Sequence, residues 1–234
     1  ILHPKAKEGG EVSDVAAVTF TMANGIQTTG YGSTRVYLPA GEVTVTASMG
    51  EAQVTETITV APGDQIERDI FIGAGLAVVD AYYVDGMILE GTQHAVEISE
   101  AKQSIDGTRK RLTTDYGPGA KFDLPPGDYI ATITEGAAQA EAAFTVKAGE
   151  RTVVSVVLDA GVLAVTAPGA TSIEVAKAKA DINGNRTQMA FDYAETKTVA
   201  LPEGDYLITV MRGDTKAEGT AKVTKGERSE INVP

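Results

Sequence analysis

The 234-residue sequence contains no cysteine and no tryptophan, and aromatic residues make up only 6% of it. The absence of cysteine excludes disulfides, thiolate zinc sites and cysteine nucleophiles. No apolar stretch approaches the roughly 18 residues that a membrane-spanning helix needs, so we predict no membrane insertion. The chain opens ILHPKAKEGG without a methionine, and we expect it to be a piece of a longer product with flanking domains.

The residue combinations that enzymes use are also scarce. His3 and His94 are the only histidines, and no G-x-S-x-G nucleophile motif occurs. The paired glycines near residues 30 and 73 lack the third glycine and the helix context of a phosphate-binding loop. The sequence therefore predicts a protein that is not an enzyme and that carries no cofactor.

The charge balance is strongly acidic, with 32 Asp and Glu against 20 Lys and Arg and a net charge of −12. An acidic surface repels phosphate backbones and anionic lipid headgroups. We therefore expect neither nucleic acid nor a membrane surface as a partner.

What the sequence does have is a repeated segment. An L-P-x-G turn begins at Leu38, Leu124 and Leu201. Aligned on the glycine of this turn, the copies share further glycines at the same spacings: Gly41, Gly50, Gly63 and Gly75; Gly127, Gly136, Gly149 and Gly161; Gly204, Gly213 and Gly226. Such a common register is evidence of duplication. It divides the chain into three predicted repeats, 1–74, 75–160 and 161–234.

Each repeat shows the pattern of short strands. After each turn apolar and polar residues alternate, as in Val43, Val45 and Ala47, which indicates a strand with one buried face. About seven such strands in roughly 75–85 residues are typical of a β-sandwich. The prediction is an all-β protein with three tandem seven-stranded Ig-like or transthyretin-like sandwiches. Because the linkers are very short, we expect a semi-rigid, elongated array roughly 100 Å long.

Asx-Gly pairs mark the expected turns between upstream strands. Asn24-Gly25, Asp106-Gly107 and Asn183-Gly184 occupy corresponding places in the three repeats. Such pairs favour the positive φ angles of two-residue hairpin turns, and we predict that turn at all three places.

The segments LPPGDY and LPEGDY, from Leu124 and Leu201, resemble the tyrosine-corner segment of fibronectin type III and related Ig-like domains. They are also similar to the L-P-x-G-x-Y strand of carboxypeptidase-regulatory-like (transthyretin-like, CNA-B-like) repeats. The first repeat departs from the pattern because Val43 replaces the tyrosine, so its corner hydrogen bond should be missing. The layout resembles repeat regions of bacterial von Willebrand A-type surface proteins, which implies a bacterial secreted, periplasmic or cell-surface location.

One loop has oxygen-bearing residues in a calcium-like pattern. Asp181, Asn183 and Asn185 alternate, and Asp192 stands at position twelve. However, Arg186 stands where a calcium loop needs glycine. The corresponding loop of the second repeat keeps the turn but loses most of these ligands. The favoured interpretation is a hairpin turn, with no metal site.

Two further features could bind a partner. Arg212-Gly213-Asp214 matches the integrin-binding tripeptide at a predicted hairpin tip, where glycine is already required by the turn. Tyr82, Tyr83 and Tyr31 lack an evident structural role and are candidates for an exposed aromatic patch.

Two functions remain open on the sequence alone. The first is a non-catalytic structural spacer or stalk of a secreted or cell-surface bacterial protein, expected to be a monomer. The alternative is an adhesion module that binds carbohydrate or protein through loops or exposed sheet edges.

Overall fold

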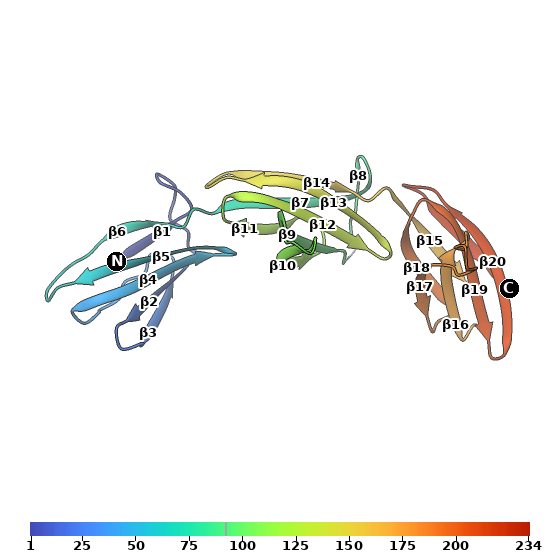
Figure 1. Cartoon of the computed structure of the whole chain (residues 1–234), viewed down its shortest axis with the longest axis horizontal. Helices are drawn as coiled ribbons and strands as arrows, with labels where there is room; N and C mark the ends of the chain where they lie inside the picture. Colours follow the sequence, from blue (N-terminus) through green and yellow to red (C-terminus); the bar gives the residue numbers. More distant parts are fainter. Residues whose placement is uncertain (92) are drawn as a thin grey trace.

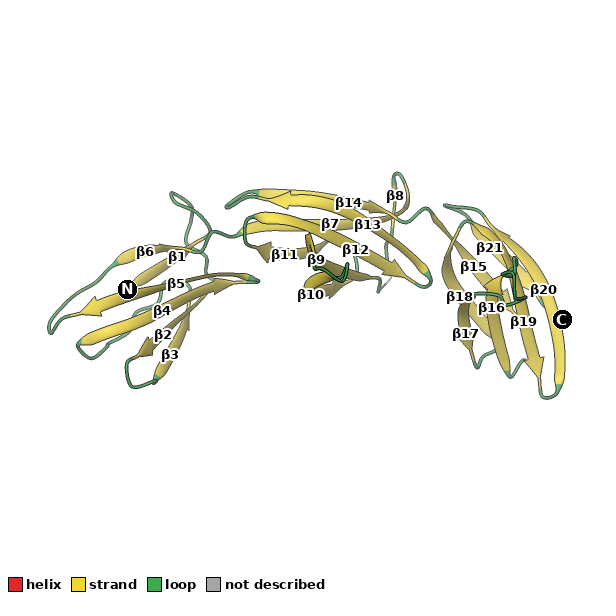
Figure 2. Cartoon of the chain, in the orientation of Figure 1, coloured by secondary structure: helices red, strands yellow, loops and turns green. Residues whose placement is uncertain are grey.

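The computed structural model describes residues 1–91 and 93–234, and within them the chain forms strands and no helix (Figure 2). The strands fall into three successive groups that follow one another in a bent row (Figure 1). The N-terminus lies in the first group and the C-terminus in the third. Because no helix occurs in the described part of the chain, no apolar helix long enough to cross a membrane is found there.

The middle group has two sheets. Its four-stranded sheet has the order β10-β9-β12-β13, and its second sheet has the order β11-β7-β14 with β8 added at β7. The strands are β7 (Gly75–Val84), β8 (Met87–Ile88), β9 (Ala95–Gln103), β10 (Arg109–Tyr116), β11 (Ala120–Leu124), β12 (Gly127–Glu135), β13 (Ala138–Val146) and β14 (Arg151–Val157). β7 pairs in parallel with β14 and antiparallel with β11.

The third group repeats this topology, with sheets β17-β16-β19-β20 and β18-β15-β21. Its strands are β15 (Ala160–Thr166), β16 (Ser172–Lys177), β17 (Gln188–Asp192), β18 (Thr196–Pro202), β19 (Gly204–Arg212), β20 (Thr215–Val223) and β21 (Arg228–Asn232). The seven strands predicted for this repeat are therefore present.

The first group has one strand fewer than the sequence predicted. It contains the sheet β3-β2-β4-β5 and the parallel pair β1-β6. Its strands are β1 (Leu2–Lys5), β2 (Ala17–Met22), β3 (Gln27–Tyr31), β4 (Gly41–Met49), β5 (Ala52–Val60) and β6 (Arg68–Phe71). In place of a counterpart to β11 there is a single bridge between Thr34 and Leu2. Beyond this bridge residues 35–38 make no ladder pairing in the described part of the chain, although Val36 and Leu38 still pack against the core of the group.

The buried faces follow the predicted alternation. The inward residues of β4, β12 and β19 are at most 5% exposed: Val43, Val45 and Ala47; Tyr129, Ala131 and Ile133; Tyr206, Ile208 and Val210. Each group buries such residues in a hydrophobic core of its own. Burial of one large apolar side chain contributes roughly 1.5–3 kcal/mol, so these faces hold the paired sheets together.

The predicted tyrosine corner is confirmed in two repeats. The hydroxyl of Tyr129 donates a hydrogen bond to the carbonyl oxygen of Pro125 at 2.8 Å, and Tyr206 donates to Pro202 at 2.7 Å. Val43 is buried at the same place in the first repeat and has no hydroxyl to donate. The L-P-x-G segment therefore positions a ring that closes the end of the sandwich.

The prediction of two-residue turns at the Asx-Gly pairs was wrong. Gly25, Gly107 and Gly184 do have positive φ angles of 81°, 82° and 85°, but the residues before them do not. In the second of these loops, Ser104 N–H donates to the carbonyl oxygen of Thr108, and three residues lie between them. A three-residue loop with a left-handed glycine at its last position also fits the twist of the two flanking strands. An Asx-Gly pair therefore does not distinguish a two-residue from a three-residue loop.

Candidate functional site

The features that set this chain apart from a single sandwich are its two joints between groups. β6 ends at Phe71 and β7 begins at Gly75, whereas β14 ends at Val157 and β15 begins at Ala160. Linkers of two or three residues keep neighbouring sandwiches within contact distance, and both joints use that proximity.

Each linker contains one residue in the left-handed region. Gly73 has a φ of 75° and Asp159, at the corresponding place, has a φ of 50°. In the described part of the chain, Asp159 is the only residue other than glycine that has a positive φ angle. Its carboxylate lies 3.1 Å from the ammonium group of Lys225 in the next repeat, although this ion pair is exposed and worth little.

A hairpin tip takes part in each joint. The β4–β5 and β12–β13 hairpins turn through two residues, Gly50-Glu51 and Gly136-Ala137. In both, the glycine has a positive φ and the second residue does not, as in a type II′ turn.

Both tips press against an edge strand of the next sandwich. The N–H of Glu51 donates to the carbonyl oxygen of Asp123 on β11 at 2.9 Å. The N–H of Ala137 donates to the carbonyl oxygen of Ala200 on β18 at 3.0 Å. A Cβ added to Gly50 would lie 2.5 Å from the Asp123 oxygen, so no larger residue fits. The sequence showed the glycines but not this second reason for them.

Apolar packing continues across the second joint. Ala160, at the start of β15, and Ala200, on β18, belong to the core of the middle group, and Ala137 packs against the core of the third group. Gly226, just before β21, lies against Val84 of β7, since a Cβ added to the glycine would stand 3.0 Å from Cγ2 of that valine. This joint is therefore a packed contact as well as a covalent link.

The structure places Tyr82 and Tyr83 beside this joint. Both lie on β7 and are half-buried, and the carbonyl oxygen of Tyr82 accepts the N–H of Leu158 at 2.8 Å. Tyr83 packs against the middle core, and its burial, followed by the Glu135 carboxylate, raises its pKa. The Tyr83 ring is therefore part of the packing of the middle group, whereas Tyr82 is tied to the joint through its main chain.

The Arg212-Gly213-Asp214 tripeptide lies at the tip of the β19–β20 hairpin, as predicted. The Arg212 guanidinium donates to the carbonyl oxygens of Pro168 and Val233, both at 2.8 Å. Gly213 and Asp214 are exposed. The arginine therefore holds the end of the chain, while the other two residues face solvent.

The calcium-like residues do not gather in one place. One Asp181 carboxylate oxygen accepts the N–H groups of Asn185 and Asn183, both at 2.8 Å, and these bonds lower its pKa. Asp192 binds Lys197 at 2.9 Å, which lowers the Asp192 pKa. Asp192 stands opposite Ile173, four strand residues and so about 13 Å from the end of β16 where the Asp181 loop begins. The described residues contain no cluster of three or more metal-ligating side chains.

One serine–histidine–carboxylate chain occurs on the first sandwich. His3 Nδ1 lies 2.8 Å from Ser33 Oγ, and His3 Nε2 lies 3.2 Å from Glu67 Oε1. The Glu67 side chain is 68% exposed, so water screens its charge. An exposed carboxylate gives the imidazole little of the orientation that a catalytic triad needs.

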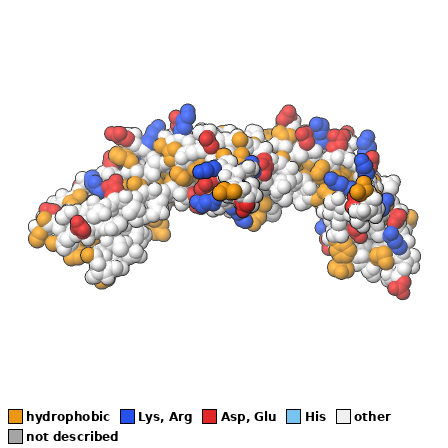
Figure 3. All heavy atoms as spheres, in the orientation of Figure 1, with side chains coloured by type: hydrophobic (Ala, Val, Ile, Leu, Met, Phe, Trp, Pro, Cys, Tyr) orange, Lys and Arg blue, Asp and Glu red, His pale blue; other side chains and the backbone are white. Residues whose placement is uncertain are grey.

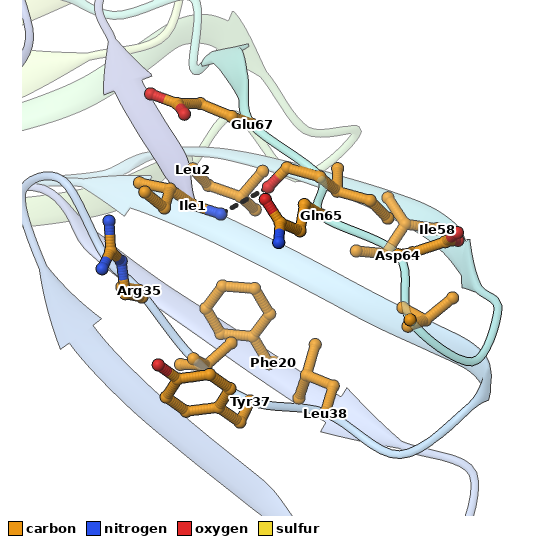
Figure 4. Close-up of a pocket in the computed structure, with 14 residues that line it drawn as sticks. Ile1, Leu2, Phe20, Arg35, Tyr37, Leu38, Ile58, Asp64, Gln65 and Glu67 are labelled. Carbon is orange, nitrogen blue, oxygen red and sulfur yellow. Dashed lines mark hydrogen bonds between the residues drawn. The ribbon is translucent and has the colours of Figure 1, made fainter.

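A cleft of about 600 Å³ opens between the two sheets of the first sandwich. Phe20, Leu38 and Ile58 line it, with Arg35 and Tyr37 on the segment that replaces a strand (Figure 4). Glu67 is among the residues that line the cleft, but neither His3 nor Ser33 is. The cleft therefore meets this chain of side chains only at its exposed carboxylate, and the histidine and serine lie outside the cleft lining.

An exposed tyrosine recurs at one position of every sandwich. Tyr31 ends β3, Tyr116 ends β10, and Tyr193 directly follows β17, and all three of these strands are edge strands. Their exposed fractions are 71%, 62% and 81%. Tyr193 also makes an edge-to-face contact with Phe191, with ring centroids 4.9 Å apart. Tyr31 was noted from the sequence, but the other two were missed because their equivalence depends on strand register.

The rest of the visible surface has no dominant patch. On the face shown in Figure 3, basic and acidic side chains are interspersed over the middle and third groups. Hydrophobic side chains on that face are scattered rather than gathered into one area.

No protein-family model and no curated protein matches this chain. Solved structures similar to it include the Bacillus anthracis TIE protein, at 15% identity and a TM-score of 0.28; the match covers 100% of this chain and 50% of that one. The minor pilin of Streptococcus agalactiae has 12% identity over 68% of this chain and 94% of its own, with a TM-score of 0.34. A streptococcal ancillary pilin has 9% identity over 99% and 97% of the two chains, with a TM-score of 0.32.

The chain is thus an all-β array of sandwiches, and bacterial pilins are among the structures similar to it. It spans half the length of the Bacillus anthracis protein.

Proposed function

We propose that the chain is a non-catalytic structural spacer of a secreted or cell-surface bacterial protein, and that its three repeats are 1–74, 75–160 and 161–234. The observation that carries the proposal is the joint. The same tip-to-edge contact, with the same hydrogen bond and a glycine that leaves no room for a side chain, occurs at Gly50 and at Gly136.

A spacer needs stiffness, because tandem domains on free linkers move relative to one another by default. A docked tip restrains that motion at each joint without a large interface. The acidic surface adds solubility and disfavours self-association.

Residual dipolar couplings of the aligned chain test this proposal. Because docked joints hold the sandwiches rigidly, we expect the three repeats to share one alignment tensor. Three tensors of clearly different magnitude would mean freely hinged sandwiches and would contradict the spacer proposal.

A second function, adhesion to carbohydrate or protein, is favoured by the exposed edge-strand tyrosines Tyr31, Tyr116 and Tyr193. Tyrosine combines an apolar face with a polar hydroxyl, a combination enriched at interfaces. One ring per sandwich would also present a multivalent surface to a polymer.

The test is a panel of immobilised glycans and matrix proteins, probed with the chain and with its Tyr31→Ala, Tyr116→Ala, Tyr193→Ala variant. Retention that falls in the triple variant supports adhesion. Retention that is absent, or unchanged in the variant, counts against it. The matched control is Tyr37→Ala, since Tyr37 is 93% exposed and lies outside the edge-strand set.

A further inference from the structure

The third sandwich carries the same hairpin tip as the other two, but within the described residues no neighbouring sandwich lies against that tip. Alignment on the L-P-x-G glycine makes Gly213-Asp214 equivalent to Gly50-Glu51 and Gly136-Ala137. The turn geometry also agrees, because Gly213 has a φ of 56° against 54° and 58° for the other two glycines.

The difference is in what lies opposite. A Cβ on Gly136 would lie 2.8 Å from the carbonyl oxygen of Ala200, whereas a Cβ on Gly213 would meet no atom within 4 Å. In the described part of the chain no acceptor is found for the Asp214 N–H, although the equivalent N–H groups of Glu51 and Ala137 are both bonded. The third tip therefore has the shape and the donor of a joint without its partner.

A second observation places the exit of the chain beside this tip. Arg212 precedes the tip glycine, and its guanidinium donates to the carbonyl oxygen of Val233 at 2.8 Å. Met49 and Glu135 occupy that position in the other repeats and cannot make this bond. A module joined after Pro234 would start next to the tip that must receive it.

We infer that Gly213-Asp214 is a docking tip for one further β-sandwich of this repeat type, joined in the same polypeptide through a linker as short as the other two. Its edge strand, the counterpart of β11 and β18, offers a main-chain carbonyl to the Asp214 N–H. A glycine opposite that carbonyl lets the two backbones approach.

Affinity arithmetic favours a tethered module over a second copy of the chain. One main-chain hydrogen bond contributes about 1 kcal/mol, far less than free association of two proteins requires. A linker of two or three residues makes docking intramolecular, so the bond adds to the packing of the joint without having to offset the cost of free association. The inference rests on the proposed spacer function in one respect: it takes the row of three repeats as one that a further repeat can continue.

The experiment extends the complete chain by a second copy of residues 158–234, placed directly after Pro234, which reproduces the linker of the second joint. Amide hydrogen exchange is then measured by NMR. In the original chain we expect slow exchange at Glu51 and Ala137 and nearly unprotected exchange at Asp214. In the extended chain we expect exchange at Asp214 to slow about fivefold or more, the factor that corresponds to one hydrogen bond.

The inference is overturned if Asp214 exchanges equally fast in both chains while the core amides of the added repeat are protected and so show that it is folded. It is also overturned if Asp214 is already slow in the original chain, whether or not dilution restores fast exchange. In that case a second copy or another part of the same chain occupies the tip.

Gly213→Ala supplies a readout that does not depend on Asp214 alone. In the original chain it strains only the turn, because no atom lies opposite. In the extended chain the new Cβ should also prevent docking and abolish the added protection. Retained protection in the extended variant would contradict the geometry. This exchange test reads the joint itself, so its failure is distinguishable from failure of the spacer proposal, which the alignment tensors of the original three repeats decide.

Discussion

The second joint should open when Gly136 is replaced by alanine. The added Cβ would lie 2.8 Å from the carbonyl oxygen and 2.9 Å from the nitrogen of Ala200, both backbone atoms that cannot rotate away. The hairpin must withdraw, and the hydrogen bond from the Ala137 N–H is lost. That bond is worth about 1 kcal/mol, so the ratio of docked to undocked joints should fall at least about fivefold.

Turn strain has to be separated from the effect on the joint. Gly136 has a φ of 58°, and an alanine in this region costs roughly 1–2 kcal/mol wherever it stands. Gly213→Ala is the matched control because its φ of 56° gives the same strain with no neighbour within 4 Å. Both variants should therefore lower the free energy of unfolding similarly, while only Gly136→Ala should loosen the joint.

Double electron–electron resonance measures the distribution of distances between two spin labels, and so reports directly how loose the second joint is. The chain has no cysteine, so Gln103→Cys and Thr220→Cys place one label on an exposed residue of each neighbouring sandwich. We expect a narrow distance distribution in the parent and in Gly213→Ala, and a broad one in Gly136→Ala. An unchanged distribution in Gly136→Ala, or equal broadening in both variants, would refute the reasoning.

Three further predictions concern individual side chains. Tyr206→Phe should lower the free energy of unfolding by about 1 kcal/mol in a urea titration, because the hydrogen bond to Pro202 is lost, whereas Tyr193→Phe should change nothing. Hydrogen bonds from neighbouring hydroxyl and N–H groups hold the pKa of Asp106 at about 2, below its ordinary 3.8. Its stabilisation should therefore be complete above about pH 4 and be lost as the pH falls through about 2, which an NMR titration of its loop would follow. Calcium at about 1 mM should leave the amide signals around Asp181 unshifted, since that carboxylate already accepts two N–H groups; saturable shifts would contradict this.

Strand faces were the most predictable part of the fold. Apolar and polar residues alternate around Val45, Ala131 and Ile208, and the apolar ones are the buried ones. This alternation therefore predicted the core residues of all three groups. The corner bonds of Tyr129 and Tyr206 were also predictable, because donor and acceptor lie only four residues apart.

Features that depend on distant partners were not predictable in the same way. An Asx-Gly pair fixes a positive φ but not the number of residues in the loop, which is why the turns at Gly25 and Gly107 were predicted too short. The strand expected at residues 35–38 of the first sandwich is absent because the main-chain pairing with β1 stops at the single bridge of Thr34, which the residues of the segment do not reveal.

The candidate site shows the same limit. The glycine at Gly50 and Gly136 was visible as a repeat anchor and was explained by its turn alone. Its second role, contact with Asp123 or Ala200, appears only when consecutive sandwiches are placed against each other. For the same reason the sequence drew the Arg212-Gly213-Asp214 prediction from the charged residues of the tripeptide and gave its glycine only a role in the turn.

Small-angle X-ray scattering of the chain at two concentrations, with calcium and with EDTA, tests the central claim most directly. Three sandwiches docked end to end predict a maximum dimension of roughly 100 Å and a radius of gyration near 30 Å, independent of concentration and of EDTA. A compact particle of 234 residues would have a radius of gyration of only about 17 Å. A value near that figure, or one that changes on chelation, would contradict the account of a preformed spacer.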